Sequence, residues 1–253
     1  MTERADLVVV GGGTVGGWAS VFAAAAGAER VVVLEEGAVG QGATSRAAGQ
    51  VRAQGGTPET IELGRWAIDF YRSQQATYGA DSGFRELGYL ILAGTEAEEQ
   101  TGRERVAFQR EQGLDVSWVE PAQAHTLNPT LPPEAHRGGS YLPTDGYIEP
   151  ARNIVAYSVA MRQAGVDLRE RTAFTGLQLA GGKVVGVETT AGPIATERVL
   201  LTGGPQLRRV GKLVGARIPV GAVRHQIAVS EPHEAFQVER QAMVFDLGAG
   251  LYW

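Results

Sequence analysis

A run of valines meets a run of glycines almost at the start of the chain, in the stretch VVVGGGTVGG. Residues 7–10 form a continuous apolar run, which is typical of a strand buried on both faces of a parallel sheet. Gly11, Gly13 and Gly16 follow at once, within a segment at 14–26 whose composition is compatible with a helix. We therefore expect a buried strand, a tight glycine turn and a helix, in that order.

Each of these glycines has its own physical role in a turn that binds a dinucleotide. Gly11 permits the tight turn, Gly13 lets the backbone approach a pyrophosphate, and Gly16 lets the helix pack closely on the strand. The start of the helix offers N–H groups and a positive dipole end to the phosphates. A second apolar run at 31–34 ends in Glu35, near the spacing of an acid that binds ribose hydroxyls. The alternative is a glycine turn that serves only packing.

The chain departs from the pattern of a nicotinamide-binding unit after Glu35. Such a unit would continue with a helix and a third parallel strand, whereas EGAVGQGATSRAAGQVRAQGG follows here. We expect a second loop in which backbone groups and small hydroxyls face an extended ligand; a flexible surface loop is the alternative. The next helix has clear start signals, with Thr57 as its cap and Pro58 at its first position.

Composition excludes several classes of protein. The 253 residues are 43% hydrophobic and 20% charged, which is ordinary for a globular chain with a sizeable core. A net charge of -5 gives no sign of nucleic-acid binding. The absence of Cys excludes disulfides, thiolate metal sites and a cysteine nucleophile, and it fits a reducing compartment, so we expect a cytoplasmic protein. The apolar segment at 15–28 is too short to span a membrane, and we expect neither a signal peptide nor a metal site.

Four stretches of the chain resemble the FAD-dependent amine and amino-acid oxidoreductases of the D-amino-acid oxidase superfamily. These enzymes include glycine oxidase, sarcosine oxidase and dehydrogenase, and dimethylglycine dehydrogenase. The stretches are VVVGGGTVGG, LEEGAVGQGATSRAAG, YLPTDGYIEPARNIVAYSVAMRQAGV and VLLTGGPQLRRVGKLVGARIPVGAVRHQIAVSEP. The segment RHQIAVSEP is most similar to the sarcosine and dimethylglycine branch. The resemblance implies FAD as cofactor and oxidation of an amine carbon by hydride transfer to the flavin.

The resemblance also implies an α/β fold, α+β overall. We expect a Rossmann-like FAD-binding domain with a three-stranded β-meander, interleaved with a substrate domain built on an antiparallel sheet. The FAD-binding domain is expected at 1–84 and 145–217, and the substrate domain at 85–144 and 218–253. Because the family is longer and MVFDLGAGLYW ends inside what resembles a hairpin, we expect a C-terminal truncation that leaves the substrate domain incomplete. A natural short variant is the alternative.

Further elements are expected from hydrophobic patterning and turn signals. Strands are predicted at 86–92, 116–119, 166–169, 199–201, 220–229 and 243–247, and helices at 96–112 and 151–164. Three short strands joined by turns are predicted between 174 and 198, as the meander of the FAD-binding domain.

The resemblance implies which residues hold the cofactor. The predicted FAD contacts are Gly11, Gly13, Thr14, Val15, Gly16, Glu35, Glu36, Gly42, Ala43, Thr44, Ser45, Arg46, Ala48, Gly49, Gln50, Phe174, Thr202, Gly203 and Gly204. Members similar to dimethylglycine dehydrogenase bond a His of a HAAG motif covalently to the flavin, and here Arg46 occupies that position in SRAAG. Since Cys is also absent, we predict non-covalent FAD. Arg46 is expected to offset flavin or phosphate charge, or to form an ordinary surface salt bridge.

Two residues are candidates for catalysis. Arg52 lies where some relatives place an arginine that holds a substrate carboxylate, and a guanidinium binds a carboxylate bidentately. His225 lies in a predicted strand whose side chains are expected to face the flavin. The alternatives are a solvated loop charge for Arg52 and a packed or hydrogen-bonded side chain for His225.

The expected substrate is a small secondary or tertiary amino acid such as sarcosine. The alternatives are a primary amine, a D-amino acid or a hydroxy acid, or a non-catalytic FAD-binding subunit or inert fragment. The electron acceptor is expected to be oxygen or an electron-transfer partner.

Overall fold

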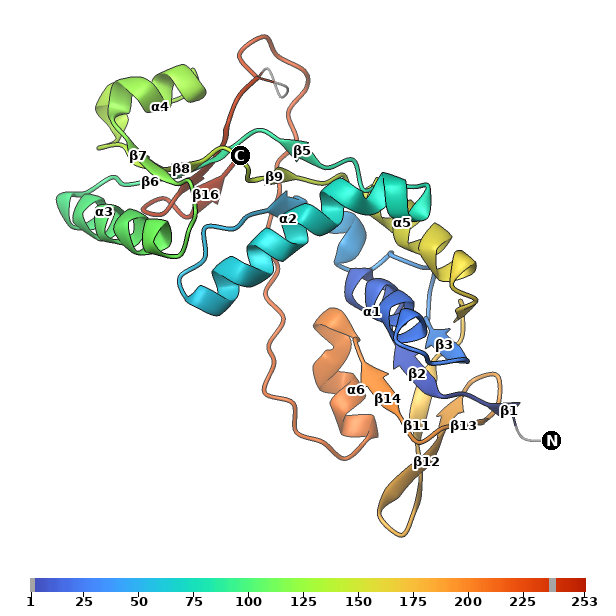
Figure 1. Cartoon of the computed structure of the whole chain (residues 1–253). Helices are drawn as coiled ribbons and strands as arrows, with labels where there is room; N and C mark the ends of the chain where they lie inside the picture. Colours follow the sequence, from blue (N-terminus) through green and yellow to red (C-terminus); the bar gives the residue numbers. More distant parts are fainter. Residues whose placement is uncertain (1–2, 237–239) are drawn as a thin grey trace. The chain divides into compact units, whose positions relative to one another are not determined.

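The computed structural model describes residues 3–236 and 240–253 (Figure 1). The chain divides into two compact units, each assembled from three separate segments. Unit 1 comprises Met1–Ala48, Gln74–Ser82 and Glu149–Gln226, and unit 2 comprises Gly49–Ser73, Gly83–Ile148 and Ile227–Trp253. Residues 49–73 lie in unit 2 and residues 218–226 in unit 1, while the domain bounds expected from the sequence stay a prediction.

Unit 1 is built on a four-stranded parallel sheet in the order β10-β3-β2-β14. Its strands are β2 (Leu7–Val10), β3 (Val31–Leu34), β10 (Asp167–Arg169) and β14 (Val199–Leu201). In β2 and β3, Val8, Val9, Val32 and Val33 are fully buried, as the continuous apolar runs predict. Two crossover helices of this unit, α1 (Thr14–Ala25) and α5 (Pro150–Gln163), lie side by side (Figure 1).

The predicted three-stranded meander is confirmed and forms a second sheet of unit 1. Strands β11 (Phe174–Ala180), β12 (Lys183–Thr189) and β13 (Ile194–Ala195) pair antiparallel, and β1 (Glu3–Arg4) adds a fourth, parallel strand. Phe174, Val187 and Ile194 pack against Val8 and Val32 of the parallel sheet. A short helix, η3 (Gly204–Gln206), and α6 (Leu207–Leu213) follow β14. The meander therefore closes one face of the central sheet.

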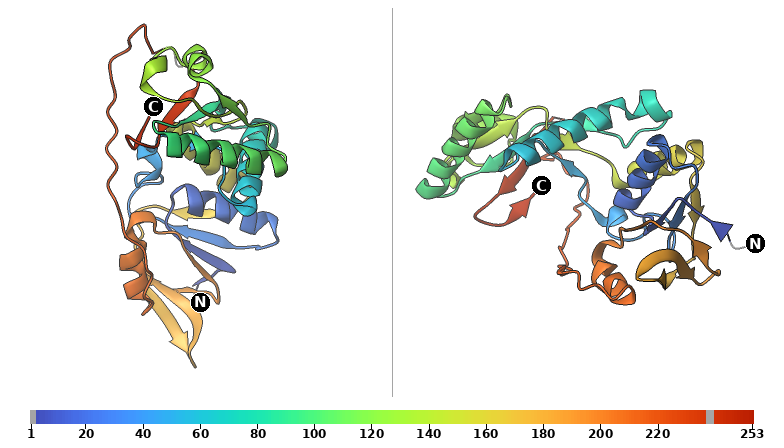
Figure 2. Two further views of the ribbon diagram at one scale, coloured as in Figure 1. Left: turned by 90° about the vertical axis from the view of Figure 1, so that its left-hand side faces the viewer. Right: turned by 60° about the horizontal axis from the view of Figure 1, so that its bottom comes forward.

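Unit 2 contains a five-stranded sheet in the order β16-β15-β6-β8-β7. The strands are β6 (Tyr89–Leu92), β7 (Ser117–Val119), β8 (Gly139–Leu142), β15 (Met243–Asp246) and β16 (Leu251–Tyr252). A small sheet joins β4 (Gln50–Val51), β9 (Gly146–Tyr147) and β5 (Arg85–Glu86). The helices are α3 (Glu96–Glu111), α4 (Pro121–Leu127), the short helix η2 (Pro133–Ala135) and most of α2 (Pro58–Tyr78), whose residues 74–78 belong to unit 1. A further short helix, η1 (Thr44–Arg46), lies in unit 1. Along the larger sheet, α3 contacts β7 and β8 (Figure 2).

The fold class is confirmed, and three details of the sequence-based expectation are corrected. The predicted antiparallel sheet is mixed, because β15 pairs parallel with β6. The strand predicted at 86–92 is two strands, because Gly88 has φ +76° and the Cβ of any other residue there would lie 2.3 Å from the ring of Tyr141. No strand forms at 220–229, where Val223 is 80% and Val229 90% exposed. An apolar pattern makes a strand only where a partner strand completes its hydrogen bonds, and no described strand pairs with this segment.

Within the described part of the chain, no helix combines the length and the apolar character needed to cross a bilayer.

Candidate functional site

The glycine turn after β2 has a geometry that only glycine accommodates at two positions. Gly11 has φ +111°, and a Cβ at this residue would lie 2.6 Å from the carbonyl oxygen of Thr202. A Cβ at Gly16 would lie 2.0 Å from the carbonyl oxygen of Gly11. The chain therefore reverses tightly between β2 and α1, and the first turn of the helix packs directly on the preceding strand, as the glycine spacing predicts.

The N-terminus of α1 is suited to an anion. Its N-cap is Gly13, which has no side chain to cap the helix, and its first turn carries no acidic residue. The N–H of Thr14 donates to Thr44 Oγ1 at 3.0 Å, and the side chain of Val15 is exposed. N–H groups in the first turn of a helix have no partners within the helix and carry the positive end of its dipole. A phosphate group would supply the missing negative charge.

Glu35 follows β3 and is held by two backbone groups. Gly12 N–H donates to Glu35 Oε2 and Gly37 N–H to Glu35 Oε1, each at 2.8 Å. The side chain is half-buried at the carboxyl end of the parallel sheet. Each carboxylate oxygen accepts more than one hydrogen bond, so both retain capacity for further donors. This arrangement presents a fixed carboxylate to a pair of hydroxyl groups beside the phosphate-binding turn.

Two residues of α5 support the glycine turn, and neither was predicted from the sequence to contact the cofactor. The hydroxyl of Tyr157 donates to the carbonyl of Gly12 at 3.1 Å, and Asn153 Nδ2 donates to Thr14 Oγ1. Burial, with a smaller contribution from the charge of Glu35, raises the pKa of Tyr157, so its hydroxyl remains a donor. Asn153 and Tyr157 are four residues apart on a predicted helix and therefore lie on the same face of it. This spacing is the sequence signal from which the pair could have been identified.

The loop from Gly37 to Ala48 contains the short helix η1. Thr44 reaches the N-terminus of α1, whereas Gly42, Ala43, Ser45 and Ala48 are exposed. The Arg46 guanidinium donates to the carbonyl oxygens of Gln41 and, at 2.6 Å, Gly42. Its contacts in the described chain are thus backbone acceptors of its own loop. A role for Arg46 against flavin or phosphate charge stays a prediction.

The other predicted cofactor residues of unit 1 differ in their surroundings. Thr202 Oγ1 donates to the carbonyl of Val10 at 2.9 Å, next to the glycine turn, and Gly203 caps η3. Glu36 is exposed and forms an ion pair of 2.6 Å with Arg209. The side chain of Phe174 is buried in the core between the two sheets of unit 1. The residues that the structure brings together around the turn are Gly11, Gly13, Thr14, Gly16, Glu35, Thr44 and Thr202.

Gly49, Gln50 and Arg52 belong to unit 2, at and beside β4. The exposed Arg52 has its guanidinium carbon 5.9 Å from the centre of the Tyr89 ring, and Tyr89 donates its hydroxyl to Gln50 Oε1 at 3.3 Å. His225 is exposed, in a segment of unit 1 without helix or strand. The catalytic roles of Arg52 and His225 stay predictions.

A buried carboxyl group in unit 2 fixes the backbone directly after Arg52. It was not among the site residues predicted from the sequence. Asp145 is fully buried; its Oδ1 accepts from the N–H of Ala53 at 2.7 Å and its Oδ2 from Gln54 Nε2 at 3.1 Å. Gln54 in turn donates to the carbonyl of Tyr89 at 2.9 Å. Burial raises the pKa of Asp145 to about 6, against the opposing effect of these hydrogen bonds and of the Arg52 charge.

In the described residues, no group of three or more His, Cys, Asp or Glu side chains is placed to hold a metal ion.

A parallel sheet with a glycine turn, a following helix and an acid after the second strand defines the Rossmann-like class of dinucleotide-binding folds. Residues 6–252 match the family described as FAD dependent oxidoreductase, and the chain belongs to this family. The family predicted from the sequence is thus confirmed. FAD is the cofactor of the family, and oxidoreductase its class of activity.

Relatives of the chain oxidise amino acids and amines. It is 32% identical over 232 residues to glycine oxidase of Geobacillus kaustophilus, covering 88% of this chain and 61% of that protein. It is 31% identical over 220 residues to 4-methylaminobutanoate oxidase (formaldehyde-forming) of Paenarthrobacter nicotinovorans, covering 86% and 26%. The chain thus spans between a quarter and about three fifths of the length of these relatives.

Solved structures agree with the fold. The crystal structure of L-proline dehydrogenase from P. horikoshii matches with a TM-score of 0.86 at 23% identity, covering all of this chain and 67% of that one. Glycine oxidase from Geobacillus kaustophilus matches with a TM-score of 0.80 at 28% identity, covering 97% and 67%.

Proposed function

We propose that unit 1 binds FAD non-covalently and that the protein oxidises a small amino acid or amine. The observation that carries the proposal is the pairing of two features at one edge of the parallel sheet. The helix α1 begins at a glycine N-cap with no acid in its first turn, and Glu35 is held beside it by two backbone N–H groups. One feature suits a pyrophosphate and the other a pair of ribose hydroxyls.

The proposed roles follow from the chemistry of each group. Gly11, Gly13 and Gly16 allow the backbone at the start of α1 to hold the pyrophosphate, and Glu35 accepts hydrogen bonds from the ribose. Arg46, in place of a linking histidine, leaves the flavin without a covalent bond to the chain. Bound flavin supplies the hydride acceptor. Arg52 binds and orients the substrate carboxylate through its guanidinium.

The proposed substrate is a secondary or tertiary amino acid such as sarcosine. The relatives named glycine oxidase, 4-methylaminobutanoate oxidase and sarcosine oxidase subunit beta support a small amine carrying a carboxylate. The alternative substrates for the same site are a primary amine, a D-amino acid or a hydroxy acid. Oxygen or an electron-transfer partner is proposed as the acceptor, and the cytoplasm as the compartment.

The test begins with the absorption spectrum of the purified protein before and after acid precipitation. We expect a flavin spectrum that moves to the supernatant; flavin that stays in the pellet would contradict the non-covalent assignment. Reconstitution with FAD followed by anaerobic addition of sarcosine, dimethylglycine, glycine or D-alanine then identifies the substrate by bleaching. A chain that binds FAD but shows no bleaching and no turnover with an artificial acceptor is a non-catalytic FAD-binding protein, and one that cannot be reconstituted does not have the proposed function.

A further inference from the structure

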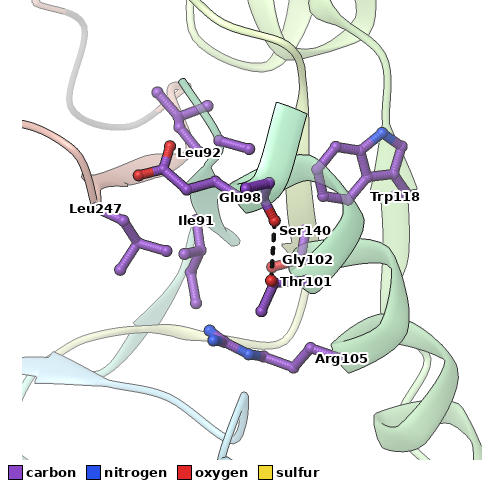
Figure 3. A pocket seen from close by; sticks show the side chains of 11 residues that line it. Ile91, Leu92, Glu98, Thr101, Gly102, Arg105, Trp118, Ser140 and Leu247 are labelled. Carbon is purple, nitrogen blue, oxygen red and sulfur yellow. Dashed lines mark hydrogen bonds between the residues drawn. The ribbon is translucent and has the colours of Figure 1, made fainter. Parts of the chain in front are cut away.

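Unit 2 contains a pocket of about 190 Å³ that the proposed FAD chemistry does not use (Figure 3). Helix α3 contributes Ala97, Glu98 and Arg105, strands β6 and β7 contribute Ile91 and Trp118, and the turn after β15 contributes Leu247. None of these residues belongs to the glycine turn or its supports. The volume lies below the several hundred Å³ that drug-sized ligands occupy, so it suits a small molecule.

Most polar side chains that line the pocket already have partners; Arg105 and the buried indole Nε1 of Trp118 form no hydrogen bond with the described residues. Glu98 Oε2 accepts from the N–H groups of Gly94 at 2.7 Å and Thr95 at 3.0 Å, as part of the cap of α3. Ser140 Oγ donates to Gln54 Oε1 at 2.8 Å, and Thr101 Oγ1 donates to the carbonyl of Ala97 at 2.9 Å. These groups complete the protein's own structure, and the walls between them are apolar.

Arg105 is the charged side chain of the pocket that has no partner among the described residues. Arg105 is half-buried as a residue, and its guanidinium forms no hydrogen bond or ion pair with residues 3–236 or 240–253. Its neighbour Arg103, by contrast, pairs with Glu99 at 3.0 Å and with Glu120 at 2.7 Å. A cation partly removed from water without a counter-charge is unfavourable, and a planar guanidinium is matched best by a carboxylate that binds both of its N–H edges.

We propose that this pocket binds a small carboxylate with a short aliphatic chain. The carboxylate pairs with Arg105, and the aliphatic chain lies against Ile91, the Trp118 ring and Leu247. Glu98 and Arg105 lie at opposite ends of the labelled side chains, with Ile91 between them (Figure 3). The Glu98 charge therefore disfavours a ligand with a second anionic group, and the single cation with apolar walls disfavours inorganic phosphate.

The binding test uses the full chain and 4-methylpentanoate, followed by ligand-observed NMR and titration calorimetry. The matched neutral ligand is 4-methylpentan-1-ol, and inorganic phosphate is the anion without an apolar chain. We expect saturable binding of the acid, at least tenfold weaker binding of the alcohol and no measurable binding of phosphate. Absence of saturable binding of the acid, or equal binding of the alcohol or of phosphate, overturns the proposal.

Two variants locate the site. Arg105→Gln removes the cation, and Ala97→Phe places a large ring at an exposed position on the rim; each is expected to weaken binding of the acid at least tenfold. Arg162→Gln, on the exposed face of α5 in unit 1, is the matched control and should bind as the wild type does. Circular dichroism checks that each variant is folded. Unchanged affinity in a folded Arg105→Gln or Ala97→Phe variant overturns the assignment, and because no flavin is required, the result is independent of the proposed FAD function.

Discussion

At the scale of single residues, Glu35 shows how backbone N–H groups of nearby residues can hold a carboxylate in place for a ligand. Both of its oxygens accept an N–H group, from Gly12 and from Gly37, so the side chain has one orientation before any hydroxyl arrives. Preorganisation of this kind removes the entropic cost of ordering the side chain on binding. Glu35 also ties the glycine turn to the end of β3, so its contribution to binding and its contribution to structure are linked.

We predict that Glu35→Gln weakens FAD binding by about 10- to 100-fold, because hydrogen bonds to a charged group contribute about 1.5–3 kcal/mol. The amide would also direct a donor toward a backbone N–H. The measurement is titration of the apoprotein with FAD, followed by quenching of flavin fluorescence. Glu29→Gln, at an exposed position beyond α1, is the control. An unchanged Kd in Glu35→Gln would show that this carboxylate does not contact the cofactor.

Asp145 gives a prediction for pH. Because burial raises its pKa from an ordinary 3.8 to about 6, the folded state retains a proton that the unfolded chain loses between these values. The free energy of unfolding should therefore fall as pH rises from about 4 to about 6, and the contribution of Asp145 to it should be constant above that range. The upper limit of the change is about 3 kcal/mol. Denaturant unfolding between pH 4 and 8 measures it.

The matched variant for this prediction is Asp145→Asn, which cannot titrate but keeps an oxygen to accept from Ala53 N–H. Its free energy of unfolding should vary less across pH 4–6 than that of the wild type. If the two proteins show the same pH dependence in that range, Asp145 is not the group responsible.

At the scale of elements, the junction of β2 and α1 depends on a contact that leaves no room for a side chain. A Cβ at Gly16 would lie 2.0 Å from the Gly11 carbonyl oxygen, and backbone at both ends of the contact cannot move aside cheaply. We predict that Gly16→Ala destabilises unit 1 by more than about 3 kcal/mol, which is in the range of severe packing defects. Thermal unfolding followed by circular dichroism measures the loss.

The control for this element is Gly176→Ala in β11, where an added Cβ meets nothing within 4 Å. It should change stability by less than about 0.5 kcal/mol, as surface substitutions usually do. Comparable unfolding temperatures for the two alanine variants would contradict the role assigned to Gly16.

At the scale of the whole molecule, two compact units are each assembled from segments distant in sequence, and residues 214–236 include a long exposed stretch without helix or strand. Exposed backbone outside regular elements is the preferred substrate of proteases. We predict that limited trypsin digestion cuts first after Arg217 or Arg224, both exposed, and mass spectrometry of the earliest fragments identifies the sites. Earliest cleavage within α1 or α5 would contradict this order.

Much of the fold and part of the candidate site could be predicted from the sequence, because their signals are local. Leu7–Val10, the glycine spacing and Glu35 lie within a short stretch of chain, and each indicates the local backbone structure without information from distant residues. The bounds of β2 and β3 coincide with the apolar runs, and α1 begins at the predicted residue. The strand predicted at 220–229 was wrong because the pattern of apolar residues in one segment does not show whether a partner strand exists.

The succession of strand, glycine turn, helix and acid follows from the sequence, because sterics and hydrogen bonding between near neighbours specify it. Two contacts become visible only in the folded chain: Tyr157 donates to Gly12 across 145 residues, and Asp145 fixes the backbone after Arg52. The folded chain alone also distinguishes Arg103, which is paired, from Arg105, which faces a pocket. The burial and the partners of a side chain depend on which elements pack together. The residue pattern within one element does not show which other elements contact it.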